Sequence, residues 1–167
     1  MSRWRRWLKE FIVLALLTAV GATVIGYLRA PSFEGAALPK VEVSKLYGLA
    51  YDSSVKPDKP YILHFWATWC PVCHAEAGNI DALAKDEKVI TVAVKSGGLE
   101  KIGEYMKANG LSFPVINDQN GAIAEAFKIG VFPTTIIVGK DGKVFWAESG
   151  YTTTWGLKFR LWLAEIF

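Results

Sequence analysis

The ten residues HFWATWCPVC, at positions 64–73, connect an apolar run to two cysteines that lie three positions apart. The run begins slightly earlier, and residues 61–67 (YILHFWA) are apolar except for His64, which is typical of a central strand covered on both faces. Pro71 follows where a helix tolerates proline, in its first turn, and this predicts a helix over residues 71–85. The cysteine pair is therefore predicted at a strand-to-helix junction.

The rest of the chain alternates strand-like and helix-like runs, and this order predicts an α/β fold. Residues 89–94 (VITVAV) have the continuous apolar character of a second buried strand, and Asp141-Gly142 is a strong hairpin turn signal. The predicted elements are strands at 61–67, 89–94, 114–116, 134–138 and 143–146, and helices at 71–85, 99–106, 122–128 and from Thr153 or Thr154 onward.

The last helix is predicted to have a threonine cap, either Thr153 or Thr154. Its large apolar residues recur at helical spacing and form one stripe, which is expected to pack in the core. The residues expected in the core from this helix and the preceding ones are Trp155, Phe159, Trp162, Ile166 and Met106.

The charge of the chain is concentrated at its N-terminus. Residues 1–29 hold five basic side chains and one acidic one, a net charge of +4, so the remainder carries 3 − 4 = −1. A nearly neutral domain gives no reason to expect nucleic acid as a partner. About 130 residues follow this segment, enough for one hydrophobic core and too few for two.

Residues 11–28 carry no charge and would span about 27 Å as a helix, close to the hydrocarbon thickness of a bilayer. Basic residues precede this run and only Arg29 follows closely, so the positive-inside rule predicts a cytoplasmic N-terminus. The expected organisation is a cytoplasmic tail (1–10), a transmembrane anchor (11–28), a tether (29–45) and one domain (46–167). A cleaved signal peptide is the alternative, although its apolar region is usually shorter.

The two cysteines are the only ones in the chain, and their spacing suits a redox pair. A thiol at a helix N-terminus lies near unpaired N–H groups and the positive end of the helix dipole, which favour its thiolate. Cys70 is therefore the predicted nucleophile, and Cys73, one turn further along, is the predicted resolving thiol.

Three other uses of the cysteines are possible. A structural zinc site needs four ligands, and the chain offers two cysteines and two histidines, of which His64 lies inside a strand and His74 adjoins Cys73. A copper(I) carrier is chemically allowed, because soft thiolates suit that ion. An inert disulfide would constrain little of the unfolded chain, because its loop is so short. The sequence predicts no resident metal and no organic cofactor.

The run HFWATWCPVC, together with Val131-Phe132-Pro133-Thr134-Thr135 about sixty positions later, resembles the thioredoxin fold, a central mixed sheet flanked by helices. The extra strand and helix between about 98 and 118 resemble the insert of the membrane-anchored TlpA-like branch. The anchor, CPVC and the tail GYTTTWGLKFRLWLA at 150–164 look most similar to the thioredoxin-like proteins of bacterial suppressor-of-copper-sensitivity systems.

This resemblance implies roles for further residues. Pro133 would be a cis proline beside the cysteines, and Phe132 would offer its backbone to an extended substrate. Trp69, and Pro71 and Val72 between the cysteines, would support the site, with Trp69 mainly a packing residue.

Two ionisable residues near the cysteines have alternative interpretations. Glu76 stands where the reductase branch often has an acid that controls the thiols, and a solvated helix carboxylate is the alternative. His64 replaces a buried Asp or Asn of the relatives. It is interpreted as a proton-transfer partner for Cys73, or as a buried histidine satisfied by hydrogen bonds.

The expected function is therefore thiol:disulfide exchange by a single-pass protein of the bacterial inner membrane, with its C-terminal domain in the periplasm. The resemblance implies a protein disulfide as substrate and a membrane thiol:disulfide interchange protein as electron donor. Pro71-Val72 lacks the His that strong oxidants of this fold often carry, which favours reduction. A thiol oxidase and a copper(I)-binding module that uses the same cysteines remain the alternatives.

Overall fold

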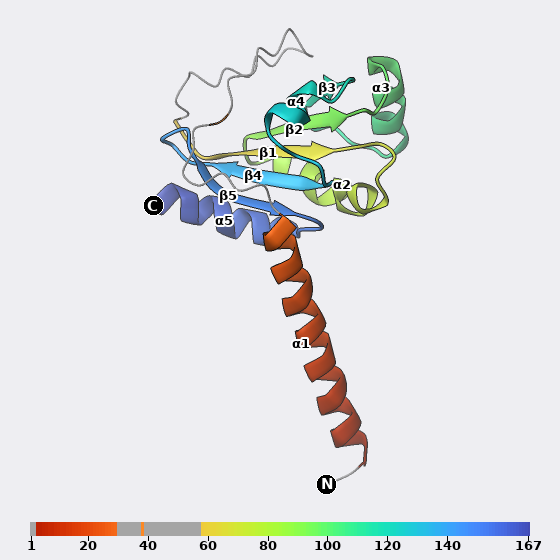
Figure 1. Ribbon diagram of the computed structural model, residues 1–167, viewed down its shortest axis with the longest axis vertical. Coiled ribbons are helices and arrows are strands. Elements are labelled where there is room, and N and C mark those ends of the chain that lie inside the picture. Colours follow the sequence, from red (N-terminus) through yellow and green to blue (C-terminus); the bar gives the residue numbers. More distant parts are fainter. Residues whose placement is uncertain (1–2, 30–37, 39–57) are drawn as a thin grey trace.

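A computed structural model describes residues 3–29, 38 and 58–167 (Figure 1). The predicted tether and the start of the predicted domain lie almost entirely outside these residues. The elements are α1 (Arg3–Arg29), β1 (Tyr61–Trp66), α2 (Pro71–Ala84), β2 (Val89–Val94), α3 (Leu99–Ala108), β3 (Val115–Asp118), α4 (Ala122–Ala126), β4 (Thr134–Val138), β5 (Val144–Ser149) and α5 (Thr154–Ile166).

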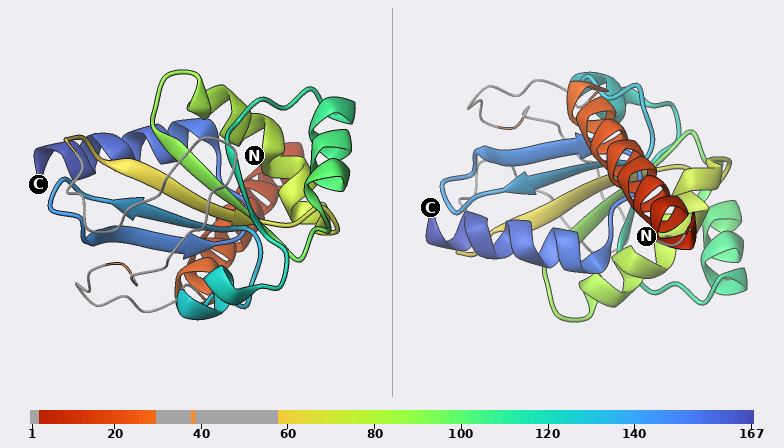
Figure 2. Two further views of the ribbon diagram at one scale, coloured as in Figure 1. Left: turned by 90° about the horizontal axis from the view of Figure 1, so that it is seen from above. Right: turned by 90° about the horizontal axis from the view of Figure 1, so that it is seen from below.

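The strands form one mixed sheet with the order β3-β2-β1-β4-β5. β1, β2 and β3 are parallel, whereas β4 runs antiparallel to β1 and β5 runs antiparallel to β4. Helices α2, α3 and α5 contribute to the core on one face, and α4 contributes to the core on the other (Figure 2). This is the thioredoxin-like α/β sandwich that the sequence predicted, and the segment between 98 and 118 holds α3 and the edge strand β3.

Alternation along β1 assigns its side chains to the two cores. Ile62 and Trp66 belong to the core beneath α2 and α5, whereas Leu63 and Phe65 belong to the opposite core with Phe127. His64 therefore points to the α2 face of the sheet. The cysteines follow at the end of this strand, so the central strand places the redox pair at one edge of a rigid framework.

The predicted boundaries differ from the observed ones where tertiary pairing extends an element. β5 continues to Ser149 because that residue still pairs with Thr134 of β4. β3 includes Asp118, whose carboxylate accepts hydrogen bonds from the backbone N–H groups of Ile123 and Ala124 and so begins α4. The cap of α5 is Thr153, whose hydroxyl accepts the N–H of Gly156.

The expectation that the apolar stripe of the last helix lies in the core is wrong. Trp155 is 83% exposed and Phe159, Trp162 and Ile166 are between 55% and 59% exposed. The helix has a second apolar face, which packs against the sheet through Leu157, Leu161 and Ala164. Met106 is half-buried and packs against that core rather than within it.

Helix α1 extends away from the domain and comes closest to it at β5 (Figure 1). Among the residues whose side chains the structure describes, which omit several positions of α1, none of the helices combines the length and the hydropathy needed to cross a membrane.

Candidate active site

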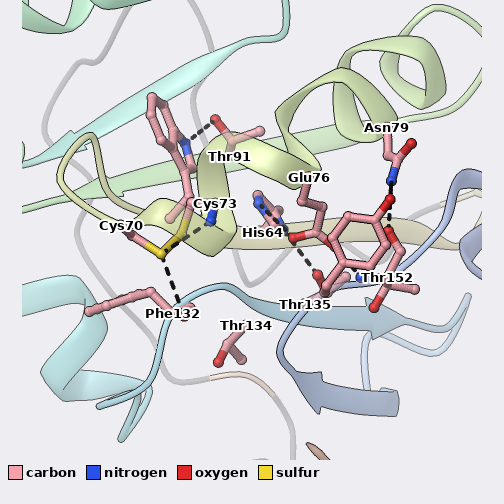
Figure 3. A network of polar contacts seen from close by, with 12 residues as sticks. His64, Cys70, Cys73, Glu76, Asn79, Thr91, Phe132, Thr134, Thr135 and Thr152 are labelled. Carbon is pink, nitrogen blue, oxygen red and sulfur yellow. Dashed lines mark hydrogen bonds and ion pairs between the residues drawn. A yellow bond between two sulfur atoms is a disulfide. The ribbon is translucent and has the colours of Figure 1, made fainter. Parts of the chain in front are cut away.

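Cys70 is the N-cap residue of α2, and its side chain serves as the cap. The N–H of Cys73 donates to Sγ of Cys70 at 3.2 Å, and the N–H of His74 donates to the Cys70 carbonyl oxygen at 3.1 Å. The two cysteines form a disulfide with 5.2 Å between their Cα atoms (Figure 3). They are 4% and 2% exposed, so in this oxidised state access barely distinguishes them. The helix N-terminus distinguishes the two cysteines, because the sulfur of Cys70 accepts a backbone N–H from the first turn of α2.

The loop before β4 faces Cys70. The peptide bond between Phe132 and Pro133 is cis, as the resemblance implies, and the carbonyl oxygen of Phe132 lies 3.6 Å from Sγ of Cys70. Trp69 covers the same side: its indole N–H donates to the Lys95 carbonyl oxygen at 3.2 Å, and its ring meets that of Phe132 edge-on at 5.7 Å.

The residues around the disulfide combine a fixed backbone with an apolar surface. Trp69 is 57% exposed and Val72 is 43% exposed, and Pro71 is exposed as well. Val131, next to the cis-proline loop, is 39% exposed. Such an apolar surface can exclude water from the contact between the disulfide and a bound polypeptide. The backbone of Phe132 stays close enough to pair with that polypeptide.

His64 is buried on the α2 face of β1. Its Nδ1 is 2.9 Å from the hydroxyl of Thr135 on β4, and its Nε2 is 4.0 Å from Oε2 of Glu76 (Figure 3). Burial lowers the pKa of His64 from 6.5 to about 3, so the ring is neutral at neutral pH. One ring nitrogen of His64 is therefore within hydrogen-bond distance of Thr135, as expected of a buried structural histidine. The other nitrogen faces the carboxyl group of Glu76.

Glu76 is fully buried, so the alternative of a solvated helix carboxylate is wrong. The backbone N–H of Thr152 donates to its Oε1 at 2.8 Å, and its Oε2 has no hydrogen-bond partner among the described residues. Burial raises the pKa of Glu76 from 4.5 to about 8; the Thr152 hydrogen bond opposes this shift and the nearby Glu148 adds to it. At neutral pH Glu76 is therefore mostly protonated beside a neutral His64.

Glu148 was not predicted from the sequence. In the sheet, His64 of β1 pairs with Thr135 of β4, and Thr135 pairs with Glu148 of β5, so the three residues form one row across three strands. Burial raises the pKa of Glu148, an effect opposed by Arg160, which forms an ion pair with it at 2.9 Å. The row could be found only after the register of both strand pairs was known.

The segment that binds Glu76 is itself fixed to α2. The side-chain amide of Asn79 donates to the Thr152 carbonyl oxygen and to the Tyr151 hydroxyl, both at 3.0 Å (Figure 3). Thr152 therefore holds Glu76 and is held by Asn79, one turn further along the same helix. Among the described residues, no group of three or more His, Cys, Asp or Glu side chains is gathered as a metal site would need.

If His64 accepts the proton of Cys73, as predicted from the sequence, its replacement with asparagine should slow resolution of a preformed mixed disulfide by about tenfold or more. Asparagine can retain the contact with Thr135, but it lacks the nitrogen that faces Glu76. Stopped-flow release of a thiol from the mixed disulfide across pH 5 to 9 measures the effect, and alkylation of Cys70 should be nearly unchanged. A variant with the parent rate over this range would leave His64 a purely structural role.

Comparisons with known proteins agree with this geometry. The model of the Redoxin family matches residues 33–157. The chain belongs to the Redoxin family. It is 33% identical over 165 residues to a thioredoxin-like protein of Haemophilus influenzae, and the match covers 98% of each chain. It is 29% identical over 161 residues to the thiol-disulfide oxidoreductase ResA of Bacillus subtilis, with coverage of 92% of this chain and 90% of the relative.

Solved structures of similar proteins share the fold of this Redoxin family member. StoA of Bacillus subtilis superposes with a TM-score of 0.59 at 24% identity, over 78% of this chain and 98% of StoA. A thiol:disulfide interchange protein from Chlorobium tepidum gives a TM-score of 0.65 at 23% identity, over 80% and 98% of the two chains. The prediction that the chain is a thioredoxin-like thiol:disulfide oxidoreductase is confirmed.

Proposed function

We propose that this protein reduces disulfides of other proteins in the bacterial periplasm. The observation that carries the proposal is the position of Cys70, whose Sγ accepts the N–H of Cys73 and lies 3.6 Å from the carbonyl oxygen of Phe132. A thiolate at this helix end is stabilised, and the neighbouring backbone can align an extended substrate beside it.

The proposed reaction is two successive thiol–disulfide exchanges. The Cys70 thiolate attacks one sulfur of the substrate disulfide, forms a mixed disulfide and releases the first substrate thiolate, which takes up a proton. Cys73 then loses its proton and attacks Cys70, and the second substrate thiolate leaves. The substrate gains two electrons and two protons, and the Cys70–Cys73 pair becomes the disulfide. A membrane thiol:disulfide interchange protein would reverse these steps at the same sulfurs and restore the dithiol.

The direction of exchange is tested by the redox state of the pair in living cells. With the membrane donor intact, Cys70 and Cys73 are expected to be mostly dithiol, because the proposal requires continuous recharging. Acid trapping followed by alkylation with a mass-shifting maleimide measures this fraction. A pair that is mostly disulfide, and that does not change when candidate donors are deleted, would instead support a thiol oxidase. The resemblance noted above makes copper tolerance the proposed physiological setting.

We further propose that α1 anchors the protein in the inner membrane, with the domain in the periplasm. The support is the uncharged run at 11–28 with basic residues on its N-terminal side, together with exposed apolar side chains such as Phe11, Leu14 and Leu17.

The anchor is tested with a fusion of alkaline phosphatase to the C-terminus. The fusion is expected to be active and to remain with the membranes after a carbonate wash. Recovery of a shortened, soluble periplasmic protein would contradict the anchor and would support a cleaved signal peptide.

A further inference from the structure

The outer face of α5 is apolar and exposed along its whole length. Its residues lie at positions i, i+4, i+7 and i+11, which share one side of a helix. Trp155 is 83% exposed, Phe159 is 59%, Trp162 is 55% and Ile166 is 57% exposed, and the adjoining Phe167 is 91% exposed. These five residues are called the α5 aromatic face below. The rings of Phe159 and Trp162 stack with 5.9 Å between their centroids.

The α5 aromatic face belongs to a firmly held helix. The opposite side is buried through Leu157, Leu161 and Ala164. Polar contacts fix both flanks: Lys158 forms an ion pair with Asp86, Arg160 forms one with Glu148, each at 2.9 Å, and Lys140 donates to the Glu165 carbonyl oxygen at 3.0 Å. The apolar residues are therefore presented outward by a well-packed element, and a further packed surface is what such residues ordinarily require.

The position of α5 indicates what covers it. In Figure 1, α5 lies at the lower edge of the domain, on the side from which α1 extends, and runs roughly across the direction of α1. Figure 2 (right panel) views this side, and no described element crosses α5 there. A membrane that held α1 would therefore lie next to α5.

We infer that the α5 aromatic face rests in the interfacial region of the membrane that holds α1. Tryptophan and phenylalanine are typical of helices that lie in this region, because their rings suit the boundary between headgroups and acyl chains. The exposed Lys140, whose ammonium group donates to the Glu165 carbonyl oxygen near the end of the face, has further N–H donors that suit anionic headgroups. A second weak contact is effective here because α1 already keeps the domain near the bilayer. The inference rests on the anchor proposed above and adds a second, non-spanning contact.

The full chain reconstituted in phosphatidylcholine–phosphatidylglycerol vesicles tests this inference. The difference in emission between the parent and a Trp155→Phe/Trp162→Phe variant isolates the two tryptophans of the α5 aromatic face. Lipids brominated near the headgroup end of the acyl chains are expected to reduce this difference signal at least twofold, and aqueous acrylamide is expected to quench it little. The matched control, Trp69→Phe/Trp146→Phe, isolates tryptophans outside the face, and its difference signal should be insensitive to the brominated lipids.

Three outcomes would overturn the inference. A difference signal quenched by acrylamide and not by brominated lipid would mean that the face is in water. A signal shielded from both quenchers would mean that protein, such as a second copy, covers it. If the chain does not sediment with the vesicles at all, the anchor fails as well. If only the α5 contact fails, the anchor still places Trp4 and Trp7 in the bilayer. Brominated lipid should then still reduce the total emission of the chain.

A variant that introduces negative charge into the face gives an independent measurement. Phe159→Glu/Trp162→Glu leaves the buried side of α5 intact and should retain parent activity on a small soluble disulfide. In vesicles it is expected to increase acrylamide quenching of Trp155 at least twofold. Unchanged quenching in this variant would also contradict contact between the α5 aromatic face and lipid.

Discussion

Replacing Cys73 with serine is expected to convert the enzyme into a trap that accumulates mixed disulfides through Cys70. The α2 N-terminus still stabilises the Cys70 thiolate, because the N–H that reaches Sγ belongs to the backbone of residue 73. The resolving thiol is absent, so turnover of substrate should fall by a factor of about 1,000 or more, as is usual when an essential catalytic group is removed. Non-reducing gels of cells trapped with acid, followed by mass spectrometry, identify the captured proteins.

The matched variant is Cys70→Ser, which is also inactive but should capture nothing. The two variants differ in which thiol remains, so their alkylation rates at neutral pH compare the cysteines directly. The Cys73→Ser variant, which retains Cys70, should be alkylated faster than the Cys70→Ser variant. Equal rates, or faster alkylation of the protein that retains only Cys73, would show that the assigned roles of nucleophile and resolving thiol are reversed.

Replacing Glu76 with glutamine is expected to remove a large part of the pH dependence of stability. The pKa of Glu76 is raised from 4.5 to about 8 by burial, so the folded state holds this proton more tightly than the unfolded state does. The resulting stabilisation is complete below about pH 4.5 and is lost as the pH rises to about 8. Between pH 5 and 8 the parent should lose about 3 kcal/mol through this group, at 1.36 kcal/mol per pKa unit.

Glutamine suits this test because it stays neutral and keeps an oxygen for the N–H of Thr152. The free energy of unfolding in urea, measured for oxidised parent and variant at several pH values, should diverge in favour of the variant as the pH rises. His64, whose pKa is lowered to about 3, destabilises both proteins as the pH falls below about 6.5, so its effect cancels in the difference. The exposed Glu87→Gln provides the control. Parallel pH profiles for parent and Glu76→Gln would refute the raised pKa.

The strand assignments could be predicted because buried strands leave a nearly continuous apolar signal. Residues 61–67 and 89–94 have this signal, broken only by His64 and Thr91, and the structure places β1 and β2 there. The orientation of the last helix could not be predicted, because α5 has two apolar sets with the same period. The set of larger residues, which begins with Trp155, was expected in the core, but the set that contains Leu157 and Leu161 is the one packed against the sheet.

The polar part of the site was only partly predictable for a different reason. The cysteines, Pro133 and the acid at position 76 follow from local spacing and from a family resemblance. The neighbourhood of Glu76 depends on contacts between distant segments: Thr152 is 76 positions away in sequence, and Glu148 joins the row only through two strand registers. Such contacts follow from the closed fold and leave no local pattern in the sequence.

The hydrogen bond that caps α2 couples the stability of this helix to the redox state of the two cysteines. The acceptor for the Cys73 N–H is the sulfur that changes its charge during the reaction. A thiolate accepts this hydrogen bond more strongly than a disulfide sulfur, so reduction tightens the first turn of α2. The free energy that this hydrogen bond gains on reduction therefore stabilises the reduced state of the pair. A gain of about 1.4 kcal/mol raises the reduction potential of the pair by about 30 mV. Substitutions in the first turn of α2 that leave both cysteines untouched should therefore change the reduction potential of the pair.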